Sequence, residues 1–157
     1  MKLLDQNEAK FNATLEAAGL TKLSSVESKF LREFVWVMAP VAQGLDILQR
    51  NKDMYAGYLI PTALSIERQL LARRTMDGKP LKYCEVLART LAAALRDPKR
   101  FGSYLEDRDL AIAAVLLPAF KMDWIFDINR EADIKAAILE EMAVEDSLVE
   151  ENLRAGK

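Results

Sequence analysis

Leu110–Phe120 reads Leu-Ala-Ile-Ala-Ala-Val-Leu-Leu-Pro-Ala-Phe, a run without a single charged or hydrogen-bonding side chain. Charged residues border it on both sides, with Asp109 before it and Lys121 after it. An apolar helix that lacks a polar face has to be covered on all sides. The run is too short to cross a bilayer, which takes about 20 apolar residues. We therefore predict a buried central helix near residues 109–122.

The segments around this run favour helix as well. Apolar residues recur at every third or fourth position in most of the chain, and Ala, Leu, Glu, Lys and Arg, which favour helix, dominate the composition. We predict an all-α fold: a single domain over residues 1–157, built as a bundle of about six or seven helices around the central one. We expect residues 1–20 to be a loosely docked helix and residues 143–157 to be acidic and frayed.

Prolines and glycines indicate where these helices end. Gly19 stands where a left-handed C-terminal cap closes the first helix. Pro40 lies inside the second apolar stripe and predicts a kink or a break, because proline lacks a backbone amide. Asp77-Gly78-Lys79-Pro80 is the clearest turn, and we expect Pro80 to open the next helix. Asp97-Pro98 should stop that helix. Asn129 can cap a final helix that begins at Arg130 and ends near Asn152.

Helical spacing also predicts which side chains face the core. The second helix has a stripe that contains Phe34 and Leu45, and the final helix has one that contains Ile134, Ile138 and Met142. We expect both stripes to point inward.

The composition removes several functional classes. Hydrophobic residues make up 51% of the chain, which is ample for a core, and the formal net charge of -2 argues against an electrostatic nucleic-acid binder as a whole. The sequence contains no histidine, which is the usual general base and the commonest transition-metal ligand. One cysteine, Cys84, allows neither an internal disulfide nor a cysteine-based zinc site. We predict a protein without enzymatic activity or cofactor, located inside the cell, in the nucleus or the cytoplasm.

Acidic residues offer one possible metal site. Glu106, Asp107 and Asp109 could hold a hard cation such as Mg²⁺ together with Asp123 or Asp127. The alternative is that these carboxylates cap helices and solubilise their ends, which we favour at about nine to one.

Basic residues offer a possible nucleic-acid surface. Residues 50–100 hold eleven Lys and Arg against five Asp and Glu, a net charge of +6, whereas residues 129–157 hold four against eight, a net charge of −4. Cations gathered on one face are the footprint that nucleic-acid binding requires. The candidate residues are Arg73, Arg74, Lys79, Lys82, Lys99 and Arg100. The alternative, which we favour at about three to one, is that they are the solvated faces of two helices.

Two tryptophans and the cysteine could also belong to a binding or catalytic site. Trp36 and Trp124 could stack on a base, but core packing is the better interpretation for both, at about four to one. Cys84 falls on the inward face of its helix, and we interpret it as a small core residue and not as a nucleophile.

Two parts of the sequence resemble a known family. The first comprises Phe34–Gln49 and Tyr55–Thr62, and the second is Leu110–Ile125. In order and spacing they resemble the helical region of hAT-superfamily DNA transposases and their domesticated, BED-finger-containing relatives. Leu117 and Ala119 replace the family's usual Asp and Arg on either side of Pro118, whereas Phe120-Lys121 is kept.

The resemblance implies a fragment and not a transposase. The family's zinc finger needs cysteine and histidine ligands that cannot be placed here, and no position matches its catalytic acidic residues, so no catalytic residue carries over. The resemblance implies an inactive, transposase-derived helical domain that acts as a structural or protein-interaction module, with a protein partner or self-association. The alternative is a weak, non-specific nucleic-acid-binding domain that uses the basic section at residues 68–100.

Overall fold

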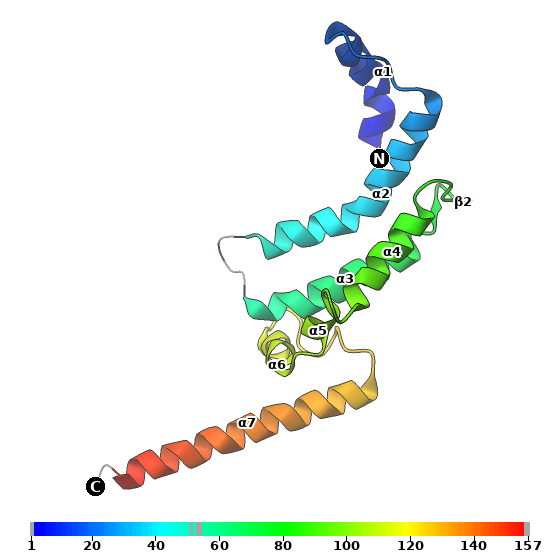
Figure 1. Ribbon diagram of the computed structural model, residues 1–157. Helices are drawn as coiled ribbons and strands as arrows, with labels where there is room; N and C mark the ends of the chain where they lie inside the picture. Colours follow the sequence, from blue (N-terminus) through cyan, green and yellow to red (C-terminus); the bar gives the residue numbers. More distant parts are fainter. Residues whose placement is uncertain (1, 51, 53–54, 156–157) are drawn as a thin grey trace. The chain divides into compact units, whose positions relative to one another are not determined.

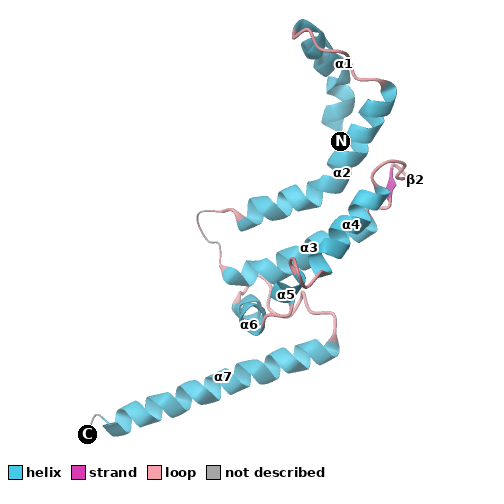
Figure 2. Cartoon of the chain, viewed as in Figure 1, coloured by secondary structure: helices cyan, strands magenta, loops and turns pink. Residues whose placement is uncertain are grey.

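The computed structural model describes residues 2–50, 52 and 55–155, and side chains for residues 9–50, 52 and 55–144 (Figure 1). Within these residues the chain forms seven α-helices, a short 3₁₀ helix and one two-stranded hairpin, so that helix dominates the cartoon in Figure 2. The predicted all-α class is confirmed. In chain order the elements are α1 (Lys2–Ala17), α2 (Ser25–Leu48), η1 (Ala56–Tyr58), α3 (Leu59–Ala72), β1 (Thr75–Met76), β2 (Lys79–Pro80), α4 (Glu85–Arg96), α5 (Gly102–Leu105), α6 (Arg108–Leu116) and α7 (Ile128–Ala155).

Contacts divide the chain into two units, each with its own core. Unit 1 consists of Met1–Ile47 and Ser65–Leu95, and unit 2 consists of Leu48–Leu64 and Arg96–Lys157. The buried hydrophobic cluster of unit 1 contains Val37, Leu70, Leu81, Cys84, Ala88 and Ala92. That of unit 2 contains Ile60, Ala63, Leu105, Ala111, Ala114, Trp124 and Ile134. Small alanines contribute to both clusters, which lets helix backbones approach closely.

The N-terminal helix ends as its glycine predicts. Gly19 has a φ of 73°, the Leu20 amide donates to the Leu15 carbonyl at 2.8 Å, and the Gly19 amide donates to the Glu16 carbonyl at 3.0 Å. These are the two hydrogen bonds of a Schellman cap. Most of the described side chains of α1 are exposed, including that of Phe11.

Helix α2 passes through its proline without ending. Pro40 lies inside the helix and is buried, and Figure 1 shows the helix axis changing direction along its length. One missing amide removes one backbone hydrogen bond, which bends a helix and need not end it when the turns on either side pack well. The bend agrees with the predicted kink, and the alternative of two separate helices is wrong.

The buried face of α2 differs from the predicted one. Phe34 and Leu45 are exposed. The buried residues are Ser28, Glu33, Val37, Pro40 and Gly44. From Glu33 onward they recur every three or four positions, so the period is helical and only the rotation of the predicted face was wrong. Glu33 lies on this buried face, where its carboxylate accepts backbone amides that precede α4, as described below.

A tight hairpin separates α3 from α4. Asp77 and Gly78 both have positive φ angles, 52° and 74°, as a type I′ turn requires, and β1 pairs with β2 in antiparallel register. The predicted turn is confirmed. Pro80 does not open a helix, because it pairs with Thr75 and because the next amide, that of Leu81, donates to the Arg74 carbonyl at 3.0 Å. Helix α4 begins at Glu85 instead.

The central helix is shorter than expected. Helix α6 begins after Asp107, whose carboxylate accepts the Leu110 amide at 2.9 Å, and it ends at Leu116. Leu117 is extended, with a ψ of 122°, because the residue before a proline avoids helical geometry. Ala111 and Ala114 are buried, but the side chain of Leu116 is 67% exposed. Leu116, Pro118 and Ala119 are exposed, so the predicted burial of the whole run is wrong.

The final helix begins earlier and ends later than predicted. Asp127, and not Asn129, caps α7: its carboxylate accepts the Asn129 amide at 2.9 Å, and its carbonyl accepts the Glu131 amide. Helix α7 continues to Ala155. The fraying expected for residues 143–157 stays a prediction, and residues 156 and 157 lie outside the described residues.

Candidate functional site

The predicted basic residues fall into both units. Arg73, Arg74, Lys79 and Lys82 surround the hairpin of unit 1, whereas Lys99 and Arg100 belong to unit 2. The Arg73 guanidinium lies 4.2 Å from the centre of the Trp36 ring and donates to the Trp36 carbonyl. This arginine therefore ties the end of α3 to α2 and is not available to a ligand. Nucleic-acid binding by the remaining five stays a prediction.

The tryptophans pack as expected. Trp36 is partly buried against the unit 1 cluster, under Arg73. Trp124 is buried in the unit 2 cluster, and its Nε1 donates to the Lys121 carbonyl at 3.0 Å. The Arg73 guanidinium covers one face of the Trp36 ring, and the Trp124 side chain is buried, so core packing fits both residues.

Glu33 is a buried carboxylate that sequence analysis did not identify. Its side chain is 6% exposed and accepts three backbone amides: those of Lys82 at 2.9 Å, Tyr83 at 2.7 Å and Cys84 at 3.0 Å. These amides precede α4 and have no partner in that helix. The carboxylate thus joins α2 to the start of α4. The signal in the sequence was its helical spacing, because Glu33 shares one face of α2 with Val37, Pro40 and Gly44, and that face is the buried one.

These hydrogen bonds control the charge of the group. Burial acts to raise the pKa of the Glu33 carboxyl, but the three amides and the Lys82 ammonium outweigh it and hold the pKa below its usual range. The carboxylate therefore stays ionised. Its charge and burial together raise the pKa of the Cys84 thiol, burial being the larger cause. A buried, protonated thiol is a poor nucleophile, which agrees with the core role predicted for Cys84.

We expect this carboxyl to make folding stability depend on pH. A group whose pKa is lower in the folded chain adds stability that is fully present above its unfolded pKa and is lost as the pH falls through its folded pKa. Wild type should therefore lose more stability than the Glu33→Gln variant between about pH 6 and about pH 3. Urea unfolding of both proteins across this range measures the difference. Parallel stability curves would contradict the prediction.

In unit 2 an open groove lies between α7 and the segment that joins α5 to α6. Its volume is about 520 Å³. Its charged lining residues are Glu106, Asp107, Arg108, Arg130, Asp133 and Glu140. Ala111, Ile134, Ala136 and Ala137 supply the apolar part. Four carboxylates and two guanidinium groups give the lining a net negative charge.

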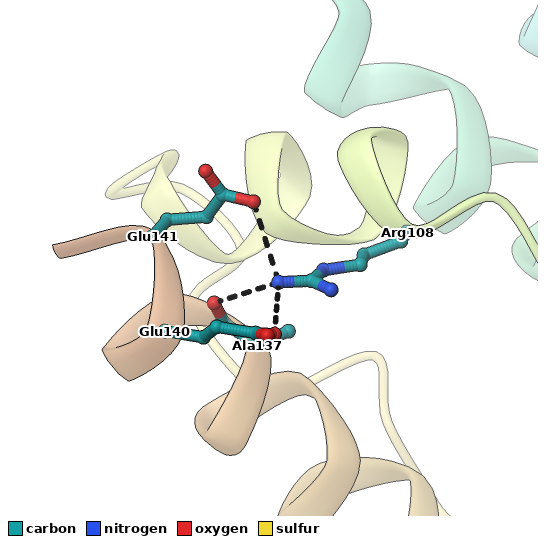
Figure 3. A network of polar contacts seen from close by, with 4 residues as sticks. All are labelled: Arg108, Ala137, Glu140 and Glu141. Carbon is teal, nitrogen blue, oxygen red and sulfur yellow. Dashed lines mark hydrogen bonds and ion pairs between the residues drawn. The ribbon is translucent and has the colours of Figure 1, made fainter. Parts of the chain in front are cut away.

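Both arginines of this groove serve to hold α7 in place. Figure 3 shows Arg108 Nη2 pointing at three acceptors on α7: Glu140 Oε2 at 2.7 Å, Glu141 Oε1 at 3.3 Å and the Ala137 carbonyl at 3.3 Å. Arg130 extends in the opposite direction, from α7 to the Leu105 carbonyl, with Glu106 at 3.7 Å. The two arginines thus bind α7 to the α5–α6 segment from both sides.

The acidic residues considered for a metal site are engaged in other ways. Asp107 caps α6, Asp127 caps α7, and Glu106 pairs with Arg130. Over the described part of the chain, no group of three or more His, Cys, Asp or Glu residues has the geometry to hold a metal ion. The capping interpretation is confirmed for Asp107 and Asp127.

Helix α7 also has an apolar face that is open to solvent. Ile128 is 79% exposed, Leu139 is 66% exposed and Met142 is 57% exposed. The inward orientation predicted for Met142 is therefore wrong, whereas Ile134 is buried and Ile138 is partly buried as predicted. The core-facing side of α7 changes character after Ile138, because the next residues on that side are held by Arg108 instead of by apolar contacts. We call Ile128, Ala132, Leu139 and Met142 the outer stripe of α7.

Comparisons with known proteins add no relative. No family model matches the chain, and neither the curated proteins nor the solved structures contain a significant match. In the described residues, no helix has both the length and the apolar character that spanning a membrane requires. The proposed function therefore rests on the surfaces and side-chain contacts described above.

Proposed function

We propose that this chain is a non-enzymatic helical module that acts by binding another protein or a second copy of itself. The observation that carries the proposal is the outer stripe of α7, where three large apolar side chains are more than half exposed. Exposed apolar residues that gather on one face and are bordered by polar ones are typical of protein-binding surfaces. The ionisable groups discussed above are engaged in caps and ion pairs, which supports a structural role over a catalytic one.

The proposal includes descent from the helical region of hAT-superfamily transposases. Its support is the set of three blocks Phe34–Gln49, Tyr55–Thr62 and Leu110–Ile125. They fall respectively in α2 with its flanking residue, in η1 with the start of α3, and in α6 with the turns that follow it. The single cysteine, Cys84, is a free thiol, which fits a reducing compartment, and we place the module in the nucleus or the cytoplasm.

Association should depend on the outer stripe. We expect the Leu139→Gln/Met142→Gln double variant to weaken association at least about tenfold, because each exposed apolar side chain would lose the area that it buries in the complex. A photo-crosslinking amino acid at position 139 captures a bound partner in cells. Light scattering on the purified chain detects association with a second copy. Val86 is 64% exposed on α4, and Val86→Gln is the matched control.

The same measurements can refute the proposal. A strictly monomeric chain that forms no crosslinked product from position 139 would exclude binding through this face. Equal loss of association in the Val86→Gln control would place the binding surface elsewhere.

A further inference from the structure

The outer stripe of α7 continues at heptad spacing to the end of the helix. Helix α7 is one helix from Ile128 to Ala155 (Figure 1). Alternating steps of four and three residues lead from Ile128 through the outer stripe, with Lys135 between its members, to Asp146, Val149 and Leu153. These positions extend over about 37 Å, which is more than three heptads. Apolar residues that keep this spacing over three or more heptads are typical of a coiled coil.

The described part of this line lies away from the core of unit 2. Lys135 and the members of the outer stripe are all exposed. The buried residues of α7 in the described part are Ile134 and Ala137, roughly 150° around the helix from the stripe. A second helix could therefore lie along the stripe without displacing the core contacts of α7.

The line of residues is symmetrical about a point midway between Leu139 and Met142. Lys135 stands four residues before Leu139, and Asp146 stands four residues after Met142. Ala132 and Val149 stand seven residues from the same two positions, and Ile128 and Leu153 stand eleven residues from them. The two charged residues of the line, one basic and one acidic, are thus equally far from its centre.

This symmetry fits a second copy that runs in the opposite direction. In that register Leu139 lies opposite Met142 of the second copy, and Lys135 lies opposite its Asp146. The other layers are apolar and join Ile128 with Leu153 and Ala132 with Val149. A shift by one heptad would set Lys135 against a leucine, and a parallel pair would set it against a second Lys135. Only the symmetrical register matches the charges.

The flanking positions agree with the same register. The edge of the stripe that contains Ala136 and Ala143 meets its own counterpart, and two alanines let the helix backbones approach closely. On the other edge Glu131 meets an asparagine and Ile138 meets a glutamate. No two carboxylates oppose each other across these edges. The pairs are Asn129 with Glu150, Ala136 with Ala143, Glu131 with Asn152 and Ile138 with Glu145.

We propose that α7 binds α7 of a second copy as an antiparallel two-stranded coiled coil centred between Leu139 and Met142. This inference rests on the proposed function and names the partner. The apolar layers supply the affinity, and the pair of Lys135 with Asp146, which the two-fold axis generates twice, fixes the register. Lys135 also keeps its own Glu131, one turn earlier, as a neighbour.

Charge reversal in the full chain tests the register. Lys135→Asp and Asp146→Lys each place two like-charged pairs in the coil, so each should weaken the dimer at least about tenfold in sedimentation velocity. The double variant Lys135→Asp/Asp146→Lys exchanges the two charges and should return the dissociation constant to within about threefold of wild type. An equal mixture of the two single variants should form a heterodimer, because both of its charged layers are then attractive.

Two controls accompany these variants. Asp133→Lys changes the net charge as much as Asp146→Lys does, but position 133 lies outside the stripe, so this variant should not weaken the dimer. Circular dichroism shows whether each variant keeps its helix content.

Cysteine substitutions determine the direction of the second helix. A mixture of Ile128→Cys chains with Leu153→Cys chains should be joined by a short thiol-reactive crosslinker. Neither variant alone should be joined, because like positions lie about 37 Å apart in an antiparallel pair. The native Cys84 is buried and gives a common background.

Several results would overturn the inference. They are a chain that stays monomeric up to about 100 μM, a double variant as weak as the single ones, and crosslinking within either unmixed cysteine variant. A foreign protein captured from position 139 while the purified chain stays monomeric would also overturn it, but would leave the proposed function standing. A monomeric chain that captures nothing from position 139 would overturn both.

Discussion

Replacing Glu33 by alanine is expected to lower the free energy of unfolding by about 3–5 kcal/mol. The substitution leaves the amides of Lys82, Tyr83 and Cys84 without the acceptor that they share. Cys84 is buried and Tyr83 is half-buried, and an unsatisfied buried donor costs more than the hydrogen bond contributes when it is formed. Glu33 shares the buried face of α2 with Val37, so we expect Val37 and its neighbours in the core to repack. Urea unfolding monitored by circular dichroism measures the loss.

A matched control separates this effect from the removal of any carboxylate. Glu85 is exposed in the first turn of α4, near the same backbone, and Glu85→Ala should cost less than about 1 kcal/mol. The Glu33→Gln variant keeps one acceptor oxygen and should fall between the two. If Glu33→Ala were no more destabilising than Glu85→Ala, the carboxylate would not hold α2 to α4.

Helix positions could be predicted because local chemistry determines them. Gly19 and Asp97-Pro98 act through the dihedral angles of one or two residues, and each ends a helix within a residue or two of the expected place. Pro118 acts in the same way, but it ends α6 at Leu116, earlier than the expected end near residue 122. Pro80 misled the prediction because a strand pair that depends on the positive φ of Asp77 and Gly78 takes precedence over its preference for a helix start.

The faces of the helices could not be predicted as well. The apolar stripe of α2 and the buried line through Glu33 are offset by one residue, which is about 100° around the helix. A search for apolar residues rejects the second line because it contains a carboxylate. Met142 was expected inside because its spacing continues that of Ile134 and Ile138. Its exposure depends on Arg108, a residue more than thirty positions earlier that holds Glu140 and Glu141. Contacts between distant residues of this kind leave no periodic signal in the sequence.

Replacing Gly57 by alanine is expected to cost about 3 kcal/mol of folding stability, the upper end for overpacking. Gly57 is buried in η1, and a Cβ at this position would lie 2.3 Å from the Ala113 carbonyl oxygen and 2.6 Å from its carbon. Both atoms are backbone of α6 and cannot rotate away, so η1 and α6 would have to separate. Because α6 carries Ala111 and Ala114 into the unit 2 core, the separation would open that core. Differential scanning calorimetry of the two proteins measures the loss.

Gly78→Ala distinguishes a steric effect from a backbone one. Nothing lies within 4 Å of a Cβ at Gly78, but its φ of 74° is unfavourable for alanine, so we expect a loss of about 1–2 kcal/mol from the dihedral angle alone. A larger loss in Gly57→Ala would then arise from the contact with Ala113, since no positive φ is involved there. Replacing a neighbouring side chain by a smaller one cannot restore the stability of Gly57→Ala, because the added Cβ clashes with main-chain atoms of Ala113. Equal stability of Gly57→Ala and wild type would mean that η1 and α6 do not approach as closely as the structure indicates.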